Sequence, residues 1–137
     1  MACESDAVRF VNERAARPGW PPIPDSPDCP RKLTFGSLTG DLRENAVLRA
    51  GYIAGADYVT WQHEVIARDV GLSAAQVEAV KAGGSQGHIL SPVQQAVMDF
   101  VDDVIINVRA SDATLAAVRQ HLSDEQVIDL IFCTGLY

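Results

Sequence analysis

The sequence predicts an all-α protein, and three observations support this fold class. Apolar residues recur at intervals of three and four along most of the chain, which is the spacing of one face of an α-helix. Serine residues that can cap a helix precede several of these segments. No segment alternates polar and apolar residues with the period of a β-strand. The 137 residues, 47% of them hydrophobic, suffice for one domain with one core.

The N-terminal part is predicted to differ from the rest of the chain. Residues 1–36 are expected to form a helix and a proline-rich arm, followed by a helical domain over residues 37–137. Ser5 can cap the first helix. Residues 17–32 hold six of the seven prolines. Because proline removes a backbone donor and fixes φ, this stretch is predicted to be an extended strap or a loosely packed arm.

The first two helices of the domain are predicted on either side of a turn. Asp41 and Glu44 have the spacing of a capping box, which indicates that a helix begins here. Gly51 and Gly55 are expected to loosen the end of this helix and to mark the turn. The second helix is predicted over residues 57–70, followed by a glycine that suits a helix C-terminus.

Four further helices are predicted from their caps. The N-cap residues are expected to be serines, namely Ser73, Ser91, Ser111 and Ser123. The helix that begins at Pro92 has the clearest apolar face. Its apolar residues are Val93, Ala96, Val97, Phe100, Val101, Val104, Ile105 and Val108. Asp102 and Asp103 are expected to lie on its solvated face, and the helix after Ser111 is expected to reach Leu122.

Composition argues against several classes of function. The net charge is −7 and no run of Lys and Arg is present, whereas sequence-independent binding to nucleic acid requires a basic face. No apolar stretch approaches the roughly 18–20 residues that span a bilayer, so no membrane association is expected. The N-terminus lacks the charged start and the apolar core of a signal peptide, which makes the cytoplasm the expected location.

One pair of residues is placed for chemistry. Glu44 and His63 lie about ten and about nine residues from the predicted turn, so two antiparallel helices would bring them to the same height. Ala56, Val59 and His63 share one helical face, which is apolar apart from the imidazole. A buried histidine needs a hydrogen-bond partner, and Glu44 is placed to be that partner and to fix the tautomer of the ring.

Structural explanations exist for the same residues. A glutamate at the third position of a helix is explained by the capping box alone, and His63 could be a core histidine with a satisfied ring. Trp61 is more often a core or interface residue than a ligand platform. His88 and His121 are expected to be solvated. Cys133 is expected to be a small buried residue, since the three cysteines show neither CxxC nor metal-binding spacing.

Glu44, Ala56, Val59 and His63 are separated by eleven, two and three residues. In the alkylhydroperoxidase D and carboxymuconolactone decarboxylase superfamily, which residues 37–137 resemble, this spacing reads Glu, Cys, Cys, His. The resemblance extends over LRENAVLRAGYIAGADYVTWQHEVIARDVGLSAAQVEAV and SDATLAAVRQHLSDEQVIDLIFCTGLY. It implies an alkylhydroperoxidase D-like helical fold and a homo-oligomer, either a trimer or a hexamer.

The chain departs from both branches of this superfamily. The two thiols are missing, so dithiol peroxide chemistry at this position is not expected. In the decarboxylase-like branch the second cysteine position often holds Glu, where this chain has Val59. Tyr58 stands where some relatives carry a second histidine. The resemblance therefore implies a catalytic set and a pocket lining: His63, Glu44 and Tyr58 for the first, and Ala56, Val59 and Ile66 for the second.

These residues predict a cofactor-free enzyme of the lyase, decarboxylase or isomerase type. It would transfer protons on a small organic acid, lactone or enolisable ketone. The alternative is a non-catalytic member that binds a ligand or serves assembly. No metal is expected, because one histidine with one acid is a poor metal site. The last helix is still apolar at Tyr137, so the chain is expected to be truncated or to complete this helix against a neighbouring subunit.

Overall fold

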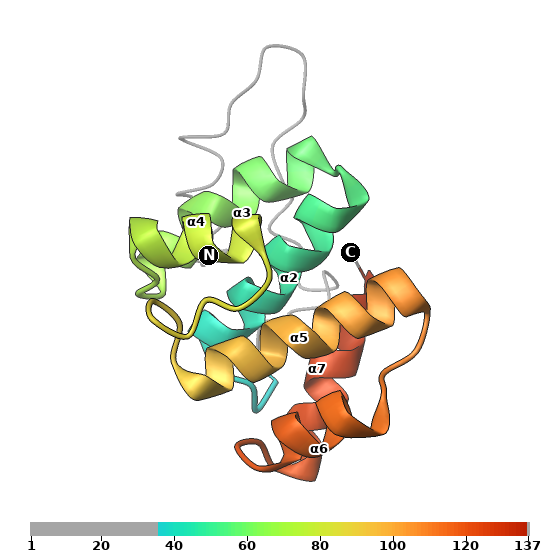
Figure 1. The fold of residues 1–137 in the computed structure, drawn as a ribbon. Coiled ribbons are helices and arrows are strands. Elements are labelled where there is room, and N and C mark those ends of the chain that lie inside the picture. The colour runs from blue at the N-terminus through green and yellow to red at the C-terminus, as the bar shows by residue number, and fades with distance from the viewer. Residues whose placement is uncertain (1–35, 137) are drawn as a thin grey trace, which may run out of the picture. The chain divides into compact units, whose positions relative to one another are not determined.

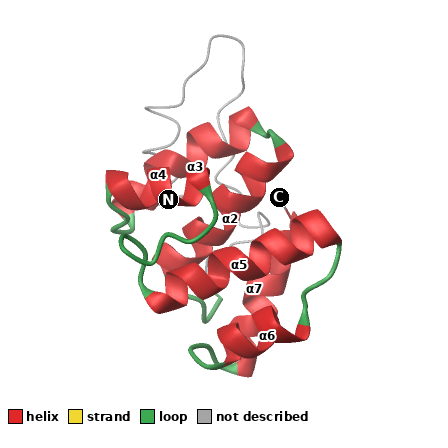
Figure 2. Ribbon diagram, in the orientation of Figure 1, coloured by secondary structure: helices red, strands yellow, loops and turns green. Residues whose placement is uncertain are grey.

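The computed structural model describes residues 36–136, and every regular element in this part is an α-helix (Figures 1 and 2). This confirms the predicted all-α class. Contacts divide the chain into residues 1–35 and 36–137. The predicted N-terminal helix and the proline-rich arm lie outside the described residues. The helices are α2 (Gly40–Ala54), α3 (Asp57–Asp69), α4 (Ala74–Ala82), α5 (Pro92–Asn107), α6 (Asp112–Arg119) and α7 (Asp124–Leu136).

Helix α2 is the centre of the described region. In Figure 1 it runs between α3 and α4 on one side and α5, α6 and α7 on the other. Leu42, Ala46 and Ala50 contribute to a core shared with α5, α6 and α7. Leu48 lies on another face and contributes to a second core, with α3, α4 and α5. Helix α2 packs against other helices on two sides, so some of its polar residues are buried as well.

The turn between α2 and α3 uses only one of the two predicted glycines. Gly55 adopts a left-handed conformation with φ 65° and ends α2, as predicted. Gly51 instead lies inside the helix and is buried, so the prediction that it marks the turn is wrong. A Cβ atom at Gly51 would lie 2.9 Å from Cγ2 of Thr60. Gly51 therefore allows α3 to approach α2 closely.

Helix α3 ends as the sequence predicts. Gly71 has φ 105°, and Leu72 N donates to Ala67 O at 2.9 Å. This is a Schellman motif, which turns the chain toward α4 and places the Leu72 side chain in the second core. The N-cap of α4 is Ser73, which forms a complete capping box with Gln76.

Helix α5 begins after the predicted N-cap residue Ser91, which also forms a capping box with Gln94. Its end differs from the prediction. Val108 follows the last helical residue in a left-handed conformation with φ 60°, and it is 86% exposed, so it does not belong to the apolar face. A β-branched side chain is rarely found in this conformation, and the periodic pattern alone does not reveal the stop.

The two aspartates predicted to be solvated on α5 in fact interact with other parts of the protein. Asp102 forms an ion pair with Arg49 of α2. Asp103 accepts hydrogen bonds from the Ser111 backbone at 3.0 Å and from Thr114 Oγ1 at 2.7 Å. These hydrogen bonds hold the pKa of Asp103 well below its usual value and tie the start of α6 to α5.

The last two helices begin at the predicted serines. Ser111 accepts a hydrogen bond from Thr114 N at the start of α6. Ser123, the predicted N-cap residue, forms a capping box with Gln126 before α7. Helix α6 ends at Arg119 rather than at Leu122, which is buried in the connection. None of the described helices is long and apolar enough to cross a membrane.

Candidate functional site

Glu44 and His63 are joined by a hydrogen bond between α2 and α3. His63 Nδ1 lies 2.6 Å from Glu44 Oε2. Glu44 is only 2% exposed, and the side chain of His63 is 12% exposed. The contact predicted from the distances to the turn is therefore confirmed. The pair lies in a part of the fold where water competes little, which strengthens the hydrogen bond.

The capping-box explanation of Glu44 is wrong. Helix α2 begins at Gly40, so Glu44 is its fifth residue rather than its third. The N-cap residue, Thr39, makes no side-chain cap hydrogen bond. A carboxylate removed from water needs partners of its own, and Glu44 finds them in His63 and in Arg43 rather than at the helix start.

Arg43 is a site residue that the sequence did not reveal. Its Nε donates to Glu44 Oε1 at 3.2 Å, so each carboxylate oxygen has its own partner. Successive residues of a helix point in directions about 100° apart, and helical spacing therefore does not pair them. The length of the arginine side chain allows the contact nevertheless.

Helix α7 lies on a further side of the pair. Cys133 is buried, as predicted. Burial is the main cause that raises the pKa of its thiol, while Arg43 lowers that pKa and the carboxylates of Asp129 and Glu44 raise it. The thiol is therefore within electrostatic reach of both members of the Arg43–Glu44 ion pair. The thiol is uncharged near neutral pH, which does not suit it to nucleophilic chemistry.

The predicted pocket residues lie along α3. Ala56 is the N-cap residue of this helix and is partly exposed. Val59 is partly buried and faces α2, since its Cγ1 would lie 3.5 Å from a Cβ atom at Gly51. Ile66 is partly buried one turn beyond His63. Whether these side chains line a cavity beside the imidazole stays a prediction.

Tyr58 lies on a different side of α3 from His63. The two residues are five positions apart, which corresponds to about 140° around a helix. The Tyr58 hydroxyl accepts a hydrogen bond from Gln62 Nε2 at 2.7 Å, and the residue is 37% exposed. The geometry therefore supports Glu44 and His63 as a unit, and a role for Tyr58 beside them stays a prediction. Trp61 is partly buried, and His88 and His121 are exposed, as predicted for the last two.

The close approach at Gly51 sets the spacing of the two helices that carry the pair. We expect Gly51→Ala to destabilise the protein, because overpacking of about 1–3 kcal/mol exceeds the helix-propensity gain of about 1 kcal/mol. Gly135→Ala on α7 is the matched control, since no atom lies within 4 Å of its added Cβ. Urea unfolding followed by circular dichroism measures both variants. If Gly51→Ala is as stable as the wild type or more stable, the close approach of the two helices is contradicted.

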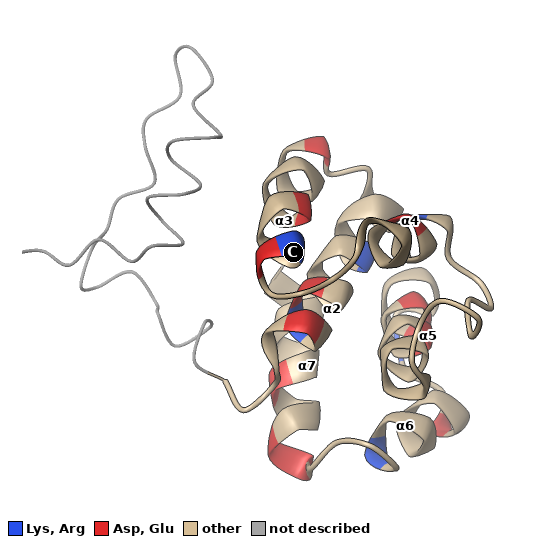
Figure 3. Ribbon diagram, turned by 90° about the vertical axis from the view of Figure 1, so that its left-hand side faces the viewer, with Lys and Arg blue, Asp and Glu red and all other residues tan. Residues whose placement is uncertain are grey.

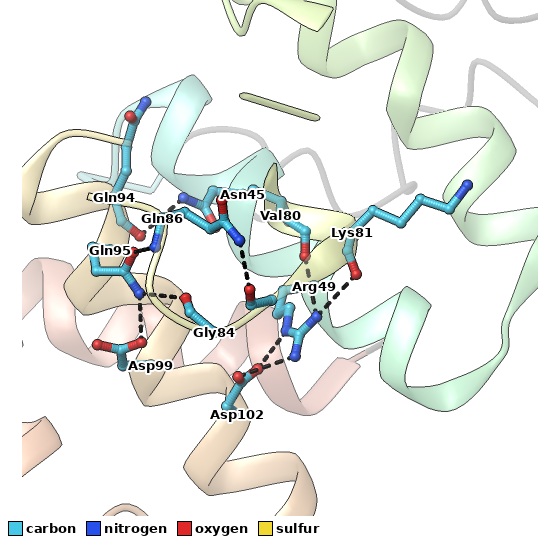
Figure 4. Close-up of polar contacts among 11 residues, drawn as sticks. Asn45, Arg49, Val80, Lys81, Gly84, Gln86, Gln94, Gln95, Asp99 and Asp102 are labelled. Carbon is cyan, nitrogen blue, oxygen red and sulfur yellow. Dashed lines mark hydrogen bonds and ion pairs between the residues drawn. The ribbon is translucent and has the colours of Figure 1, made fainter. Parts of the chain in front are cut away.

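A second polar cluster joins α2, α4 and α5 (Figure 4). Arg49 has a side chain that is 12% exposed and directs its guanidinium at Asp102 of α5, with Nη2 3.0 Å from Oδ2. It also donates to the carbonyl oxygens of Val80 and Lys81, at 3.1 and 3.3 Å. Val80 and Lys81 lie in the last turn of α4, and Asp102 lies within α5. One guanidinium therefore joins three helices.

The described helices carry charged residues of both signs. Figure 3 shows Lys and Arg on several helices, interspersed with more numerous Asp and Glu residues. Among the described residues, no group of three or more His, Cys, Asp and Glu side chains could hold a metal ion. Comparison of the chain with protein-family models, with curated proteins and with solved structures finds no match. The function must therefore be argued from the site itself.

Proposed function

We propose that the protein is a thiol-free member of the alkylhydroperoxidase D and carboxymuconolactone decarboxylase superfamily that transfers protons without a cofactor. Its substrate would be a small organic acid, lactone or enolisable ketone. The observation that carries this proposal is the buried hydrogen bond between Glu44 and His63, at 2.6 Å. A carboxylate that orients an imidazole in this way is the arrangement of a general base and its supporting acid.

The chemistry proposed for the pair follows from the ring nitrogen that Glu44 contacts. When Nδ1–H of neutral His63 donates to Glu44 Oε2, the lone pair lies on Nε2. Nε2 would take a proton from the carbon next to a carbonyl group and leave an enolate. The positive charge formed on the ring is stabilised by the Glu44 carboxylate. Return of the proton to another carbon of the enolate gives an isomer. In a decarboxylation, loss of carbon dioxide from the carbon next to the carbonyl group would itself leave the enolate, and protonated His63 would then donate its Nε2 proton to that carbon.

The residues at the two cysteine positions support this choice over peroxide reduction. Ala56 and Val59 have no thiol, and Cys133 is buried with a raised pKa. A dithiol mechanism needs two reactive sulfur atoms that can form a disulfide. Proton transfer needs only the imidazole and its carboxylate, and both are present.

We also propose that the protein is a homo-oligomer. The support for this is an apolar face on α7 whose four large side chains are each more than half exposed: Ile128, Ile131, Phe132 and Leu136. Contiguous apolar surface of this kind is typical of protein–protein contacts. Light scattering at micromolar concentration should give a mass well above 14.8 kDa, the mass of one chain. A strictly monomeric species would contradict the proposal.

The same apolar face favours one second candidate, a protein that kept the fold for assembly alone. A substrate screen distinguishes the proton-transfer enzyme from the assembly protein. Small lactones and aromatic acids are tested for a thermal shift, and each binder is then assayed for turnover by the wild-type protein and by His63→Ala. Turnover that requires His63 supports the enzyme. Binding without turnover, or turnover that His63→Ala retains, supports the non-catalytic candidate or another site.

A further inference from the structure

Arg43 is a charged side chain beside the buried pair to which the proposed reaction gives no part. Its Nε lies 3.2 Å from Glu44 Oε1, and its side chain is 17% exposed against 3% for Glu44. The imidazole of His63 contacts the other oxygen, Oε2. The two oxygens of one buried carboxylate are therefore divided between a permanent cation and an imidazole.

This division has two physical consequences. The terminal torsion of a glutamate side chain is soft, so a carboxylate held at one oxygen can rotate, whereas one held at both cannot. Burial also favours the neutral acid, and a neighbouring cation opposes this effect. A guanidinium stays charged at any pH of interest and donates in fixed directions. Arg43 is thus suited to fix the orientation of the Glu44 carboxylate and to place a positive charge beside it.

We infer that Arg43 is a positioning residue for the Glu44–His63 pair. It holds Oε1 so that Oε2 faces Nδ1 of His63, and its charge weakens the binding of a further proton by the pair. The inference rests on the proposed function for its role in catalysis. Its effect on His63 can be measured without a substrate.

Other titratable groups lie on the helices that pack against α2, and their roles differ from that of the guanidinium. Cys133 of α7 interacts electrostatically with both members of the ion pair, but its thiol is uncharged near neutral pH. The carboxylate of Asp129 raises the pKa of the same thiol. It also accepts hydrogen bonds from the first residues that the structure describes. On α3, Glu64 accepts a hydrogen bond from the Tyr52 hydroxyl at 2.8 Å. Of the groups described here, Arg43 is the cation that contacts the carboxylate of the pair.

The test is an NMR titration of the imidazole signals of His63 against pH. The chain has three histidines, so the spectrum of His63→Ala identifies the signals. Arg43→Met removes the cation and should raise the midpoint of this titration, because a nearby positive charge disfavours the protonated ring. Arg43→Lys keeps the charge and should leave the midpoint close to that of the wild type.

Arg109→Met is the matched control, since it removes an exposed arginine and changes the net charge equally. Its midpoint should equal that of the wild type. If Arg43→Met and Arg109→Met give the same midpoint, the inference is overturned. If Arg43→Met does not fold, Arg43→Gln is titrated in its place, since it keeps a donor and removes the charge. A raised midpoint together with full activity of His63→Ala would uphold the effect of Arg43 on the imidazole while refuting the proposed reaction.

Discussion

His63→Ala is expected to abolish turnover of any substrate that the screen identifies. The variant removes the ring nitrogen that would accept the proton. It also leaves Glu44 Oε2 without the partner that it has at 2.6 Å. Because Glu44 is 2% exposed, its free oxygen is not readily hydrated, and we expect a loss of stability of about 1–3 kcal/mol. Activity must therefore be measured well below the melting temperature of the variant.

Glu44→Gln separates catalysis from folding more cleanly. The amide keeps the shape of the side chain but is a weaker acceptor for Nδ1–H and does not stabilise a charged ring. We expect turnover to fall by roughly ten- to a thousand-fold, which overlaps the usual contribution of general acid–base groups. His121→Ala, which removes an exposed imidazole, should keep full activity. If His63→Ala and Glu44→Gln both match the wild type, the catalytic role of the pair is refuted.

The largest loss of stability is expected at the Arg49–Asp102 ion pair. Asp102→Asn leaves a guanidinium that is 12% exposed without its carboxylate. Breaking a fully buried pair costs about 3–5 kcal/mol, and because Asp102 is 24% exposed we expect about 2–3 kcal/mol. Asp99→Asn is the matched control on the same helix, because Asp99 is exposed and contacts Gln95 rather than a cation. Urea unfolding gives both values, and equal losses would contradict the importance of the ion pair.

Two neighbouring glycines test the placement of the Arg49 guanidinium independently. Gly83 and Gly84 both have φ 70°, so alanine is strained at either position. A Cβ atom at Gly83 would also clash with Arg49 Nη2, whereas nothing lies within 4 Å at Gly84. Gly83→Ala should therefore destabilise the protein more than Gly84→Ala does. The difference between the two free energies of unfolding reports the displacement of Arg49.

The parts of the fold that could be predicted from the sequence depend on local chemistry. Serine hydroxyls, capping glutamines and a glycine at a helix end act on backbone groups within a few residues, so Ser73, Ser91, Ser123 and Gly71 were assigned correctly. The Glu44–His63 contact was predictable for a related reason. A short turn joins the two helices, and the residues lie at nearly equal distances from it.

The parts that could not be predicted depend on distant residues or on small shifts. Arg49 and Asp102 are 53 residues apart, and no periodicity links them. Glu44 fits a capping box by spacing, but a helix start two residues earlier removes that role. Val108 continues the apolar pattern of α5 although the helix has already ended. In each case tertiary packing determines the outcome, and local spacing alone is insufficient.

The tautomer of His63 tests the central claim most directly. Long-range proton–nitrogen NMR correlation of the imidazole, at a pH where the ring is neutral, shows which nitrogen carries the proton. The hydrogen bond to Glu44 predicts that Nδ1 is protonated in the wild type and that Glu44→Ala loses this preference. A wild-type ring protonated at Nε2, with a bare Nδ1 facing Glu44, would contradict both the pair and the reaction proposed for it.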